Sequence, residues 1–370
     1  MKSLNPLDRR LFIKKSSLGL GATALGLSMM PDMACSSIAG KKKLGVALVG
    51  LGNYAGGQLA PALLETQNCY LAGIVTGTKS KEEEWMKKYN IPKENVYNYD
   101  NYDDIKNNKD IDIIYVVLPN SMHAEYTIRG ANAGKHMLCE KPMAVSVEEC
   151  QQMIDACNKN KVKLSVGYRL HYEPHNKKVM ELTKNKEFGD VRYVQAEFGF
   201  TIGDPKQWRL KKDLAGGGAV MDVGVYCIQA ARMATGEEPI AISAQEFKTD
   251  PVKFKEVDET VTWQLEFPGG AVANSTTSYN LRTNEYLVVA SEGKYGVGPA
   301  FGYGGLKGHI NGEPMGFPQV REQALQMDAF AKNVMEDTQP IVPAELGLKD
   351  MKIVEAMYKS IANGGKRVEI

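Results

Sequence analysis

The feature that most constrains the fold is an apolar strand that runs directly into a glycine-rich turn and then into a helix. Residues 44–49 are apolar and of strand length, residues 50–55 have the pattern Gly-x-Gly-x-x-Ala, and a helical pattern runs from Ala55 to about Thr66. The glycines permit a tight turn and let a pyrophosphate approach the helix N-terminus closely. With the correct strand before it and helix after it, the motif indicates a dinucleotide site.

Strands and helices alternate through the rest of the first half. A helix is expected over residues 146–160, because Ser146 and Glu149 have the spacing of a capping box. The alternation predicts a doubly wound α/β domain of the Rossmann type over residues 40–165. Its further strands are expected at residues 70–75, 111–118, 136–139 and 163–170.

The second half changes to segments with a hydrophobic period of two. Strand follows strand without crossover helices, so residues 166–345 are expected to form a large, mostly antiparallel sheet domain that is open on one face. Residues 346–370 would add a C-terminal helix and tail. An open face is expected to be a large apolar patch, which favours a homodimer or homotetramer through that face. The expected strands lie at residues 191–200, 240–248, 259–267, 271–280 and 285–291.

The first 39 residues have the features of an export signal rather than of a folded segment. Arg9 and Arg10 precede an uncharged stretch rich in Gly, Ala and Leu, and residues 37–39 offer a small-x-small cleavage site. The stretch is too short and too weakly apolar for a good membrane span. We therefore expect twin-arginine export to the periplasm and a mature chain without a transmembrane segment. Lipid anchoring at Cys35 is the lesser alternative.

Charge and cysteine content exclude several classes of function. The net charge is +1, so no strong field favours nucleic acid or an acidic membrane. Five cysteines follow the signal, an odd number without short paired spacings, and we expect small buried hydrophobic side chains rather than a disulfide framework. His171 and His175 are four residues apart, but Pro174 lies between them, so no metal site is predicted.

A carboxylate and an ammonium end the fourth expected strand, at Glu140-Lys141-Pro142. Proline fixes its own φ and biases the preceding residue toward an extended backbone. Lys141 is therefore held at a strand end, where open α/β sheets bind ligands. A surface ion pair before a turn is the alternative interpretation of this tripeptide.

The end of the second strand indicates which dinucleotide is bound. An acidic residue there would hold the ribose 2′-hydroxyl of NAD, but the sequence has Thr76, Lys79 and Lys81 instead. Hydroxyls and ammonium groups can accept a 2′-phosphate, so NADP is favoured over NAD. Ser80 could also be an ordinary helix N-cap before an acidic first turn at residues 82–84, and both interpretations can hold together.

A second chemical pair lies behind a glycine run at residues 216–218. Asp222 and Tyr226 are four residues apart, so they share one face of the helix that the glycines lead into. A carboxylate and a phenol on one face can orient a hydroxyl and move its proton. The alternative is a core tyrosine with a satisfied hydroxyl.

Taken together, these motifs resemble the glucose–fructose oxidoreductase and inositol dehydrogenase family (Gfo/Idh/MocA). The resemblance covers residues 44–370, and within the family it is closest to the periplasmic glucose–fructose oxidoreductase branch. It rests on residues 50–55, 140–142, 167–174, 207–210, 216–226 and 302–303.

The resemblance implies NADP under the glycine turn and an aldopyranose between the nicotinamide and the second sheet. Hydride would leave C1 of the sugar while Tyr226 takes the hydroxyl proton, with Lys141 as its electrostatic partner and Asp222 as the orienting group. Lys141 as the base is the competing assignment. The implied sugar contacts are Lys141, Arg169, Asp222, Tyr226 and Tyr303. The implied cofactor contacts are Gly50, Gly52, Asn53, Tyr54, Thr76, Lys79, Lys81, Tyr99, Leu118, Asn120, His123, Glu140, Lys141, Arg169, Trp208 and Arg209.

The sequence departs from that branch in one respect. The glucose–fructose enzyme has a proline-rich arm before its first strand that covers the cofactor, whereas only residues 40–43 separate the expected cleavage site from the strand here. A second sugar as internal reoxidant is therefore an open alternative. Two other functions also stay open: an NAD-dependent glycosidase that oxidises C3 transiently, and a sugar- and cofactor-binding protein without catalysis.

Overall fold

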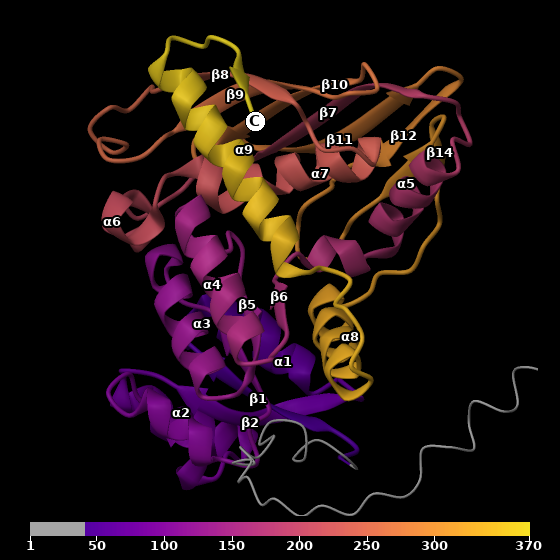
Figure 1. Ribbon diagram of the computed structural model, residues 1–370. Helices are drawn as coiled ribbons and strands as arrows, with labels where there is room; N and C mark the ends of the chain where they lie inside the picture. The colour runs from indigo at the N-terminus through magenta and orange to yellow at the C-terminus, as the bar shows by residue number, and fades with distance from the viewer. Residues whose placement is uncertain (1–40) are drawn as a thin grey trace, which may run out of the picture. The chain divides into compact units, whose positions relative to one another are not determined.

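The computed structural model describes residues 41–370, so the expected export signal and Cys35 lie outside the described residues. Two sheets organise this part of the chain, a parallel sheet followed by a larger mixed sheet (Figure 1). The expected combination of a doubly wound domain and a mostly antiparallel sheet domain is confirmed.

The first sheet has six parallel strands in the order β3-β2-β1-β4-β5-β6, the order of a Rossmann fold. Side-chain alternation along β1 sends Val46 and Leu48 into one cluster with α1 and α8, and Ala47 and Val49 into another with α3 and α4. The strand is thus buried on both faces. The elements are β1 (Leu44–Val49), η1 (Ala55–Leu59), α1 (Ala60–Leu63), β2 (Cys69–Val75), α2 (Lys79–Tyr89), η2 (Lys93–Asn95), β3 (Val96–Tyr97), η3 (Tyr102–Asn107), β4 (Ile113–Val116), η4 (Asn120–Met122), α3 (His123–Asn132), β5 (His136–Cys139), α4 (Val147–Lys159) and β6 (Leu164–Val166).

The second sheet has nine strands in the order β14-β13-β12-β11-β7-β10-β9-β8-β15. Only the β7–β10 pair is parallel among the pairs of this sheet in residues 41–370. Helices α7 and α9 pack below it. The elements are η5 (Arg169–Tyr172), α5 (Pro174–Lys184), β7 (Val191–Gly199), η6 (Trp208–Leu210), α6 (Lys212–Ala215), η7 (Val220–Gly224), α7 (Val225–Thr235), β8 (Ala241–Phe247), β9 (Thr260–Glu266), β10 (Val272–Ser278), β11 (Thr283–Ala290), β12 (Gly293–Val297), β13 (Gly308–Ile310), β14 (Glu313–Pro314), α8 (Glu322–Met335), α9 (Ala344–Ala362) and β15 (Val368–Glu369).

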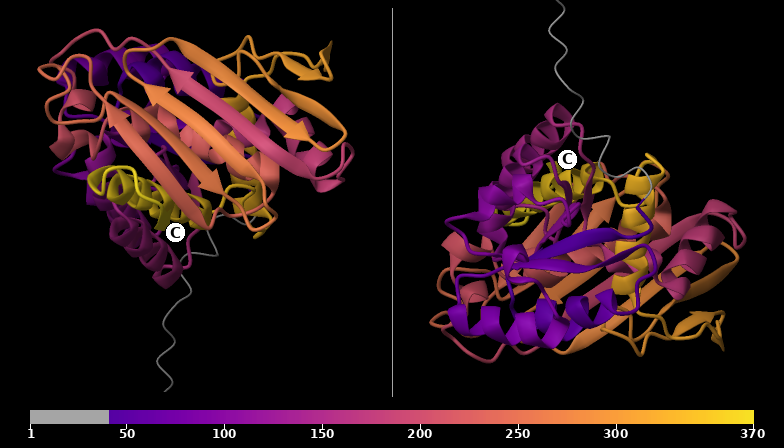
Figure 2. Two further views of the ribbon diagram at one scale, coloured as in Figure 1. Left: turned by 90° about the horizontal axis from the view of Figure 1, so that it is seen from above. Right: turned by 90° about the horizontal axis from the view of Figure 1, so that it is seen from below.

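The outer face of the second sheet is open, as expected, but it is not apolar. Figure 2, left, shows the strands without a helix over them. The side chains that line a shallow depression there include Gln195, Thr262, Gln264, Asn274 and Thr276. The expectation of a large apolar patch is therefore wrong, because polar residues occupy the outward positions of the period-two segments.

Several local expectations differ from the structure in extent. The helix after the glycine turn begins as a π-helical turn over Ala55–Leu59 and ends at Leu63, short of Thr66. Helix α2 begins at Lys79, so Ser80 is not its N-cap. The cause is a tight turn at the end of β2, in which the backbone N–H of Thr78 donates to Thr76 Oγ1 at 3.2 Å.

The capping box that was expected at the start of α4 is confirmed. Ser146 is the N-cap, and its Oγ accepts from the backbone N–H of Glu149 at 3.1 Å. The five cysteines of the described chain are free and buried, as expected of small hydrophobic side chains.

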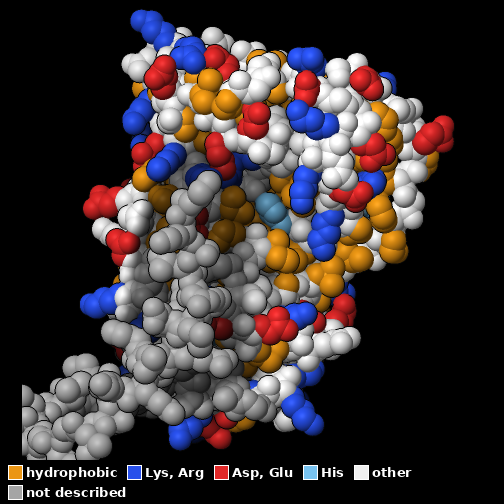
Figure 3. All heavy atoms as spheres, turned by 45° about the vertical axis from the view of Figure 1, so that its right-hand side comes forward, with side chains coloured by type: hydrophobic (Ala, Val, Ile, Leu, Met, Phe, Trp, Pro, Cys, Tyr) orange, Lys and Arg blue, Asp and Glu red, His pale blue; other side chains and the backbone are white. Residues whose placement is uncertain are grey.

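Charged and apolar surfaces are mixed. On the face shown in Figure 3, Lys and Arg side chains are interspersed with Asp and Glu rather than separated by sign. One helical stretch of the described chain, Lys212–Thr235, is long and apolar enough to span a membrane, and 83% of its tested window is buried in the fold. This stretch comprises α6, η7 and α7 and carries Asp222 and Tyr226.

Candidate active site

A cavity of about 630 Å³ lies at the carboxyl ends of the parallel strands, beside the glycine turn. Strand register explains its position, because Val49 is level with Val116, and Val116 with Cys139. The residues that follow these strands therefore meet at one edge. Between β1 and β4 the strand order reverses, which is where doubly wound sheets bind dinucleotides.

The glycine turn is shaped for a close ligand. Gly50 has φ +92°, and a Cβ there would come within 2.5 Å of the Val117 carbonyl oxygen, so only glycine fits. A Cβ at Gly52 would meet nothing within 4 Å, which means that the backbone of this residue faces open space. The turn thus has room for the pyrophosphate of a dinucleotide at the start of η1.

The end of β2 presents hydroxyls and an ammonium to the same cavity. Thr76, Thr78 and Lys81 line it there, and the Lys81 Nζ donates to the Leu51 carbonyl oxygen at 2.7 Å. This set suits the 2′-phosphate of NADP, which a carboxylate would repel. Lys79 is the first residue of α2 and does not belong to the lining.

Residues that follow β3 and β4 complete the cofactor side. Tyr99 lies against Gly77, where a Cβ would be 3.0 Å from its ring, and the Asn120 side chain donates to the Ala215 carbonyl oxygen at 2.9 Å. The ring nitrogens of His123 lie 2.8 Å from Pro142 O and 2.9 Å from Leu118 O, and burial lowers the pKa of this imidazole. His123 therefore connects two loops of the cavity wall.

Glu140 is buried between two neighbouring strand ends. The Tyr115 hydroxyl donates to its Oε1 at 2.5 Å, and a Cβ at Gly167 would lie 2.7 Å from the same oxygen. Burial raises the pKa of Glu140 despite this hydrogen bond. The carboxyl group thus fixes the backbone of the strand end from which Lys141 projects.

Three side chains of the site, those of Lys141, Arg209 and Tyr279, donate hydrogen bonds to Asp222. Lys141 Nζ donates to the Asp222 carbonyl oxygen at 2.6 Å and to Oδ1 at 3.2 Å. Arg209 Nε and the Tyr279 hydroxyl donate to Oδ2 at 2.9 and 3.2 Å. Burial alone would raise the pKa of Asp222, but Lys141 and Arg209 outweigh it and hold the pKa below its usual value. Asp222 therefore stays ionised at neutral pH.

The same arrangement keeps Lys141 charged. Burial would lower the pKa of Lys141, yet the neighbouring Tyr226 and Asp222 raise it above its usual value. Its Nζ also lies 4.9 Å from the centre of the Tyr226 ring. The lysine is thus a fixed cation beside both a carboxylate and a phenol.

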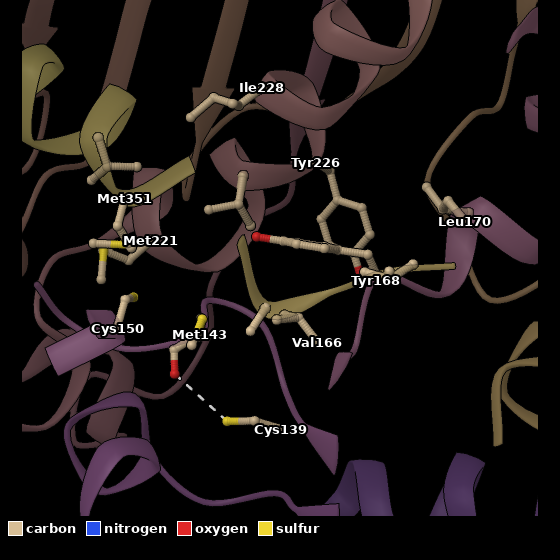
Figure 4. Close-up of a cluster of buried hydrophobic side chains, with 14 of the residues drawn as sticks. Cys139, Met143, Cys150, Val166, Tyr168, Leu170, Met221, Tyr226, Ile228 and Met351 are labelled. Carbon is tan, nitrogen blue, oxygen red and sulfur yellow. Dashed lines mark hydrogen bonds between the residues drawn. The ribbon is translucent and has the colours of Figure 1, made fainter. Parts of the chain in front are cut away.

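Tyr226 is held by aromatic neighbours. Phe198 from β7 meets its ring edge-on at 5.5 Å between centroids, and Phe301 lies at 6.0 Å. Figure 4 shows the ring projecting from α7 toward Tyr168 in the buried cluster below the site. The phenol therefore has one orientation, set by the core.

A second cavity, of about 510 Å³, adjoins the first one on the side of the second sheet. Lys141, Asp222, Tyr226 and Tyr303 line both cavities. Arg169 lines the second, with a side chain only 1% exposed, and its Nη2 donates to the Phe301 carbonyl oxygen at 2.6 Å. The second cavity joins cations and an anion to an aromatic wall, which suits the hydroxyls and C–H faces of a sugar.

The structure thus brings together all the residues expected from the sequence at the two cavities, apart from Lys79. Other residues were not expected. Phe198 and Phe200 could have been found from their alternation along a predicted strand, and Tyr279 ends another. Glu322, 3.6 Å from Arg169, gave no local signal because it comes from α8, far away in the sequence.

The two histidines considered for metal binding have other partners. His171 Nε2 lies 2.8 Å from Gln229 Oε1, and His175 Nδ1 lies 2.6 Å from Glu173 Oε1. Within residues 41–370, no group of three or more His, Cys, Asp or Glu side chains is placed to hold a metal ion.

Both halves of the chain match models of one protein family. The model described as oxidoreductase family, NAD-binding Rossmann fold (GFO_IDH_MocA) matches residues 44–168. The model described as GFO/IDH/MocA C-terminal domain matches residues 176–296.

Several of the similar proteins have names that state a sugar substrate, whereas others are named trans-1,2-dihydrobenzene-1,2-diol dehydrogenases. The chain is 28% identical to D-xylose 1-dehydrogenase [NADP(+)] of Haloarcula marismortui, covering 85% of this chain and 90% of that one. It is 30% identical to D-xylose 1-dehydrogenase (NADP(+)) 2 of Haloferax volcanii, covering 74% and 84%. The solved structure of aldose-aldose oxidoreductase from Caulobacter crescentus, complexed with glycerol, is 41% identical, with a TM-score of 0.85 and coverage of 89% and 100%.

Proposed function

The chain belongs to the Gfo/Idh/MocA oxidoreductase family, and from this premise we propose that it oxidises C1 of an aldopyranose and reduces a second aldose in return. It is an NADP-dependent sugar oxidoreductase by its relatives. The observation that carries the finer proposal is the cluster of Lys141, Asp222 and Tyr226 on the wall common to the two cavities.

Tyr226, Lys141 and Asp222 have separate roles in the proposed reaction. NADP held at the glycine turn and by Thr76, Thr78 and Lys81 would supply the acceptor for the hydride that leaves C1. Tyr226 takes the proton of the C1 hydroxyl, since a phenol is an adequate base only beside a cation and Lys141 is that cation. Lys141 keeps its own proton because its pKa is raised. Asp222 fixes the ammonium by two contacts and orients it.

A second aldose closes the cycle. Tyr226 returns its proton to the carbonyl oxygen of that sugar in its open-chain form, while C1 gains the hydride and the sugar becomes an alditol. Two aldoses would thus become one lactone and one alditol, without net consumption of NADP. The 41% identity to an aldose-aldose oxidoreductase supports this cycle.

The test is a product analysis with one aldose and no added nucleotide. D-Xylose or D-glucose should give equal amounts of aldonate, from hydrolysis of the lactone, and of alditol. Stoichiometric NADPH from added NADP, with no alditol, would contradict the cycle and leave a simple dehydrogenase. Release of nitrophenol from a nitrophenyl glycoside would instead indicate the glycosidase chemistry.

We further propose that the enzyme reaches the periplasm through a twin-arginine signal, with Arg9 and Arg10 as its recognised pair. Replacing both by Lys should leave the protein in the cytoplasm of a fractionated cell. A homodimer or homotetramer through the open sheet face is also proposed. The polar lining of that face means that hydrogen bonds, rather than an apolar patch, would carry the contact.

A further inference from the structure

Tyr303 lies in an aromatic contact that joins the two sheets across the mouth of the site. Its ring stacks on that of Tyr54 with centroids 5.5 Å apart and an interplanar angle of 30°. Tyr54 belongs to the glycine turn after β1, whereas Tyr303 lies on the loop between β12 and β13. The pair therefore links the cofactor half of the molecule to the sugar half.

The Tyr303 ring has a second partner, a buried cation. The Arg169 guanidinium lies 4.7 Å from the centroid of the ring. Even so, 59% of Tyr303 is exposed. The ring thus has two partners and still presents much of its surface to solvent, as expected of a residue at the rim of a cavity.

The loop is anchored on both sides of Tyr303 by hydrogen bonds. Before it, the backbone N–H groups of Ala300 and Phe301 donate to Asn284 Oδ1 at 2.9 and 2.7 Å. After it, the backbone N–H of Gly305 donates to Gln319 Oε1 at 2.7 Å. These anchors set where Tyr303 lies, and stacking positions its ring.

From this arrangement we propose that the Tyr54–Tyr303 stack retains the nucleotide, with Tyr303 as a cofactor-site residue contributed by the second sheet. Both rings line the cofactor cavity as well as the sugar cavity. The pair borders the cavity that would hold a nucleotide on the glycine turn, so the nucleotide would leave more slowly while the two rings are stacked.

The proposal rests on the NADP site and not on the identity of the sugar, so its experiment contains no sugar. The protein is loaded with NADPH, and dissociation is followed by the loss of nucleotide fluorescence after mixing with excess NADP. Tyr303→Ala should speed dissociation roughly 3- to 10-fold, as expected for one lost aromatic pair. Tyr303→Phe keeps the ring and should dissociate as the wild type does.

A double variant separates the stack from general loosening. Replacing Tyr303 by Ala should speed dissociation less in a protein that already has Tyr54→Ala than in the wild type, because the contact between the rings is then already gone. Additive effects of the two replacements would overturn the proposal. So would wild-type dissociation from Tyr303→Ala, or equally fast dissociation from Tyr303→Phe. The melting temperature of each nucleotide-free variant verifies that it is folded, which the exposed loop position of Tyr303 favours.

Discussion

The two cavities of the site are built in opposite ways. The cofactor cavity is made largely from strand ends, with the glycine turn after β1, Thr76 after β2 and Glu140 after β5 aligned by register. The sugar cavity is made from side chains that arrive from separate elements, including Arg169, Phe198 and Phe301. A single substitution can therefore alter the cofactor cavity locally, whereas the shape of the sugar cavity depends on how distant segments pack.

The largest expected effect is at the point where the cavities meet. Tyr226→Phe should lower kcat by roughly 10²- to 10⁴-fold, the range for loss of a general base, with little change in sugar or NADP binding. Tyr279→Phe is the matched control, since that hydroxyl contacts Asp222 but is not assigned the proton transfer. Steady-state kinetics with a saturating aldose measure both. An unchanged kcat for Tyr226→Phe would move the base to Lys141.

The next effect tests the charge cluster itself. Asp222→Asn should cost about 2 kcal/mol of stability at pH 7, because it leaves the partly buried Lys141 and Arg209 without their anion. The folded pKa of Asp222 is held below its usual value, so its contribution is present at neutral pH and is lost as pH falls through that pKa. The difference in melting temperature between wild type and variant should thus be constant from pH 8 to 5 and narrow below about pH 4.

Glu256→Gln is the control for this pH experiment. Glu256 pairs with Lys211 at 3.1 Å on the surface, where screening makes an ion pair nearly neutral for stability. Its melting temperature should follow that of the wild type at every pH. A difference for Asp222→Asn that grows as the pH falls would contradict the assigned direction of the Asp222 pKa.

An effect of similar size is expected from a single substitution in the cofactor cavity, which should change the preference for NADP over NAD. Thr76→Asp should weaken NADP relative to NAD by about 2–3 kcal/mol, or roughly 30- to 140-fold, because a carboxylate would face the 2′-phosphate. Thr76→Ser keeps the hydroxyl and should retain the preference. Calorimetric titration measures the dissociation constants of both nucleotides. An unchanged ratio of the two constants in Thr76→Asp would mean that the 2′-phosphate binds elsewhere.

The contrast between the cofactor cavity and the sugar cavity also explains which parts of the site could be predicted from the sequence. Residues 44–49 and 136–139 are short apolar runs followed by breaking residues, and both match the observed strands β1 and β5 in full. Parallel register then aligns their ends, so the cofactor residues follow from local patterns. The sugar cavity does not, because β7 is the first strand of its sheet in the chain yet pairs with both β10 and β11. No local pattern specifies those partners, so alternation could mark Phe198 as facing one side of its strand but not which residues it would meet there.

The smallest effect is expected from a contact between helix α9 and the segment that carries Asp222 and Tyr226. Asp258 Oδ1 accepts from the Tyr358 hydroxyl and from the backbone N–H of Gly218, both at 2.7 Å, and Oδ2 accepts from Val220 N–H at 2.8 Å. Asp258 thereby holds the start of the segment that carries Asp222. Tyr358→Phe removes one of its three hydrogen bonds and should cost about 1 kcal/mol of stability, seen as a lower melting temperature.

Kinetic measurements distinguish the loss of this supporting hydrogen bond from a direct effect on the reaction. In Tyr358→Phe the two backbone donors still hold Asp258, so kcat should stay within roughly threefold of the wild type at a temperature where both proteins are folded. Asp258→Asn is the stronger test, because an amide must turn its NH₂ toward one of the three donors. That variant should lower kcat more than it changes the dissociation constant for NADP, since the glycine turn at residues 50–52 belongs to the other sheet. Equal losses in both parameters would mean that Asp258 supports the whole fold rather than the position of Asp222 and Tyr226.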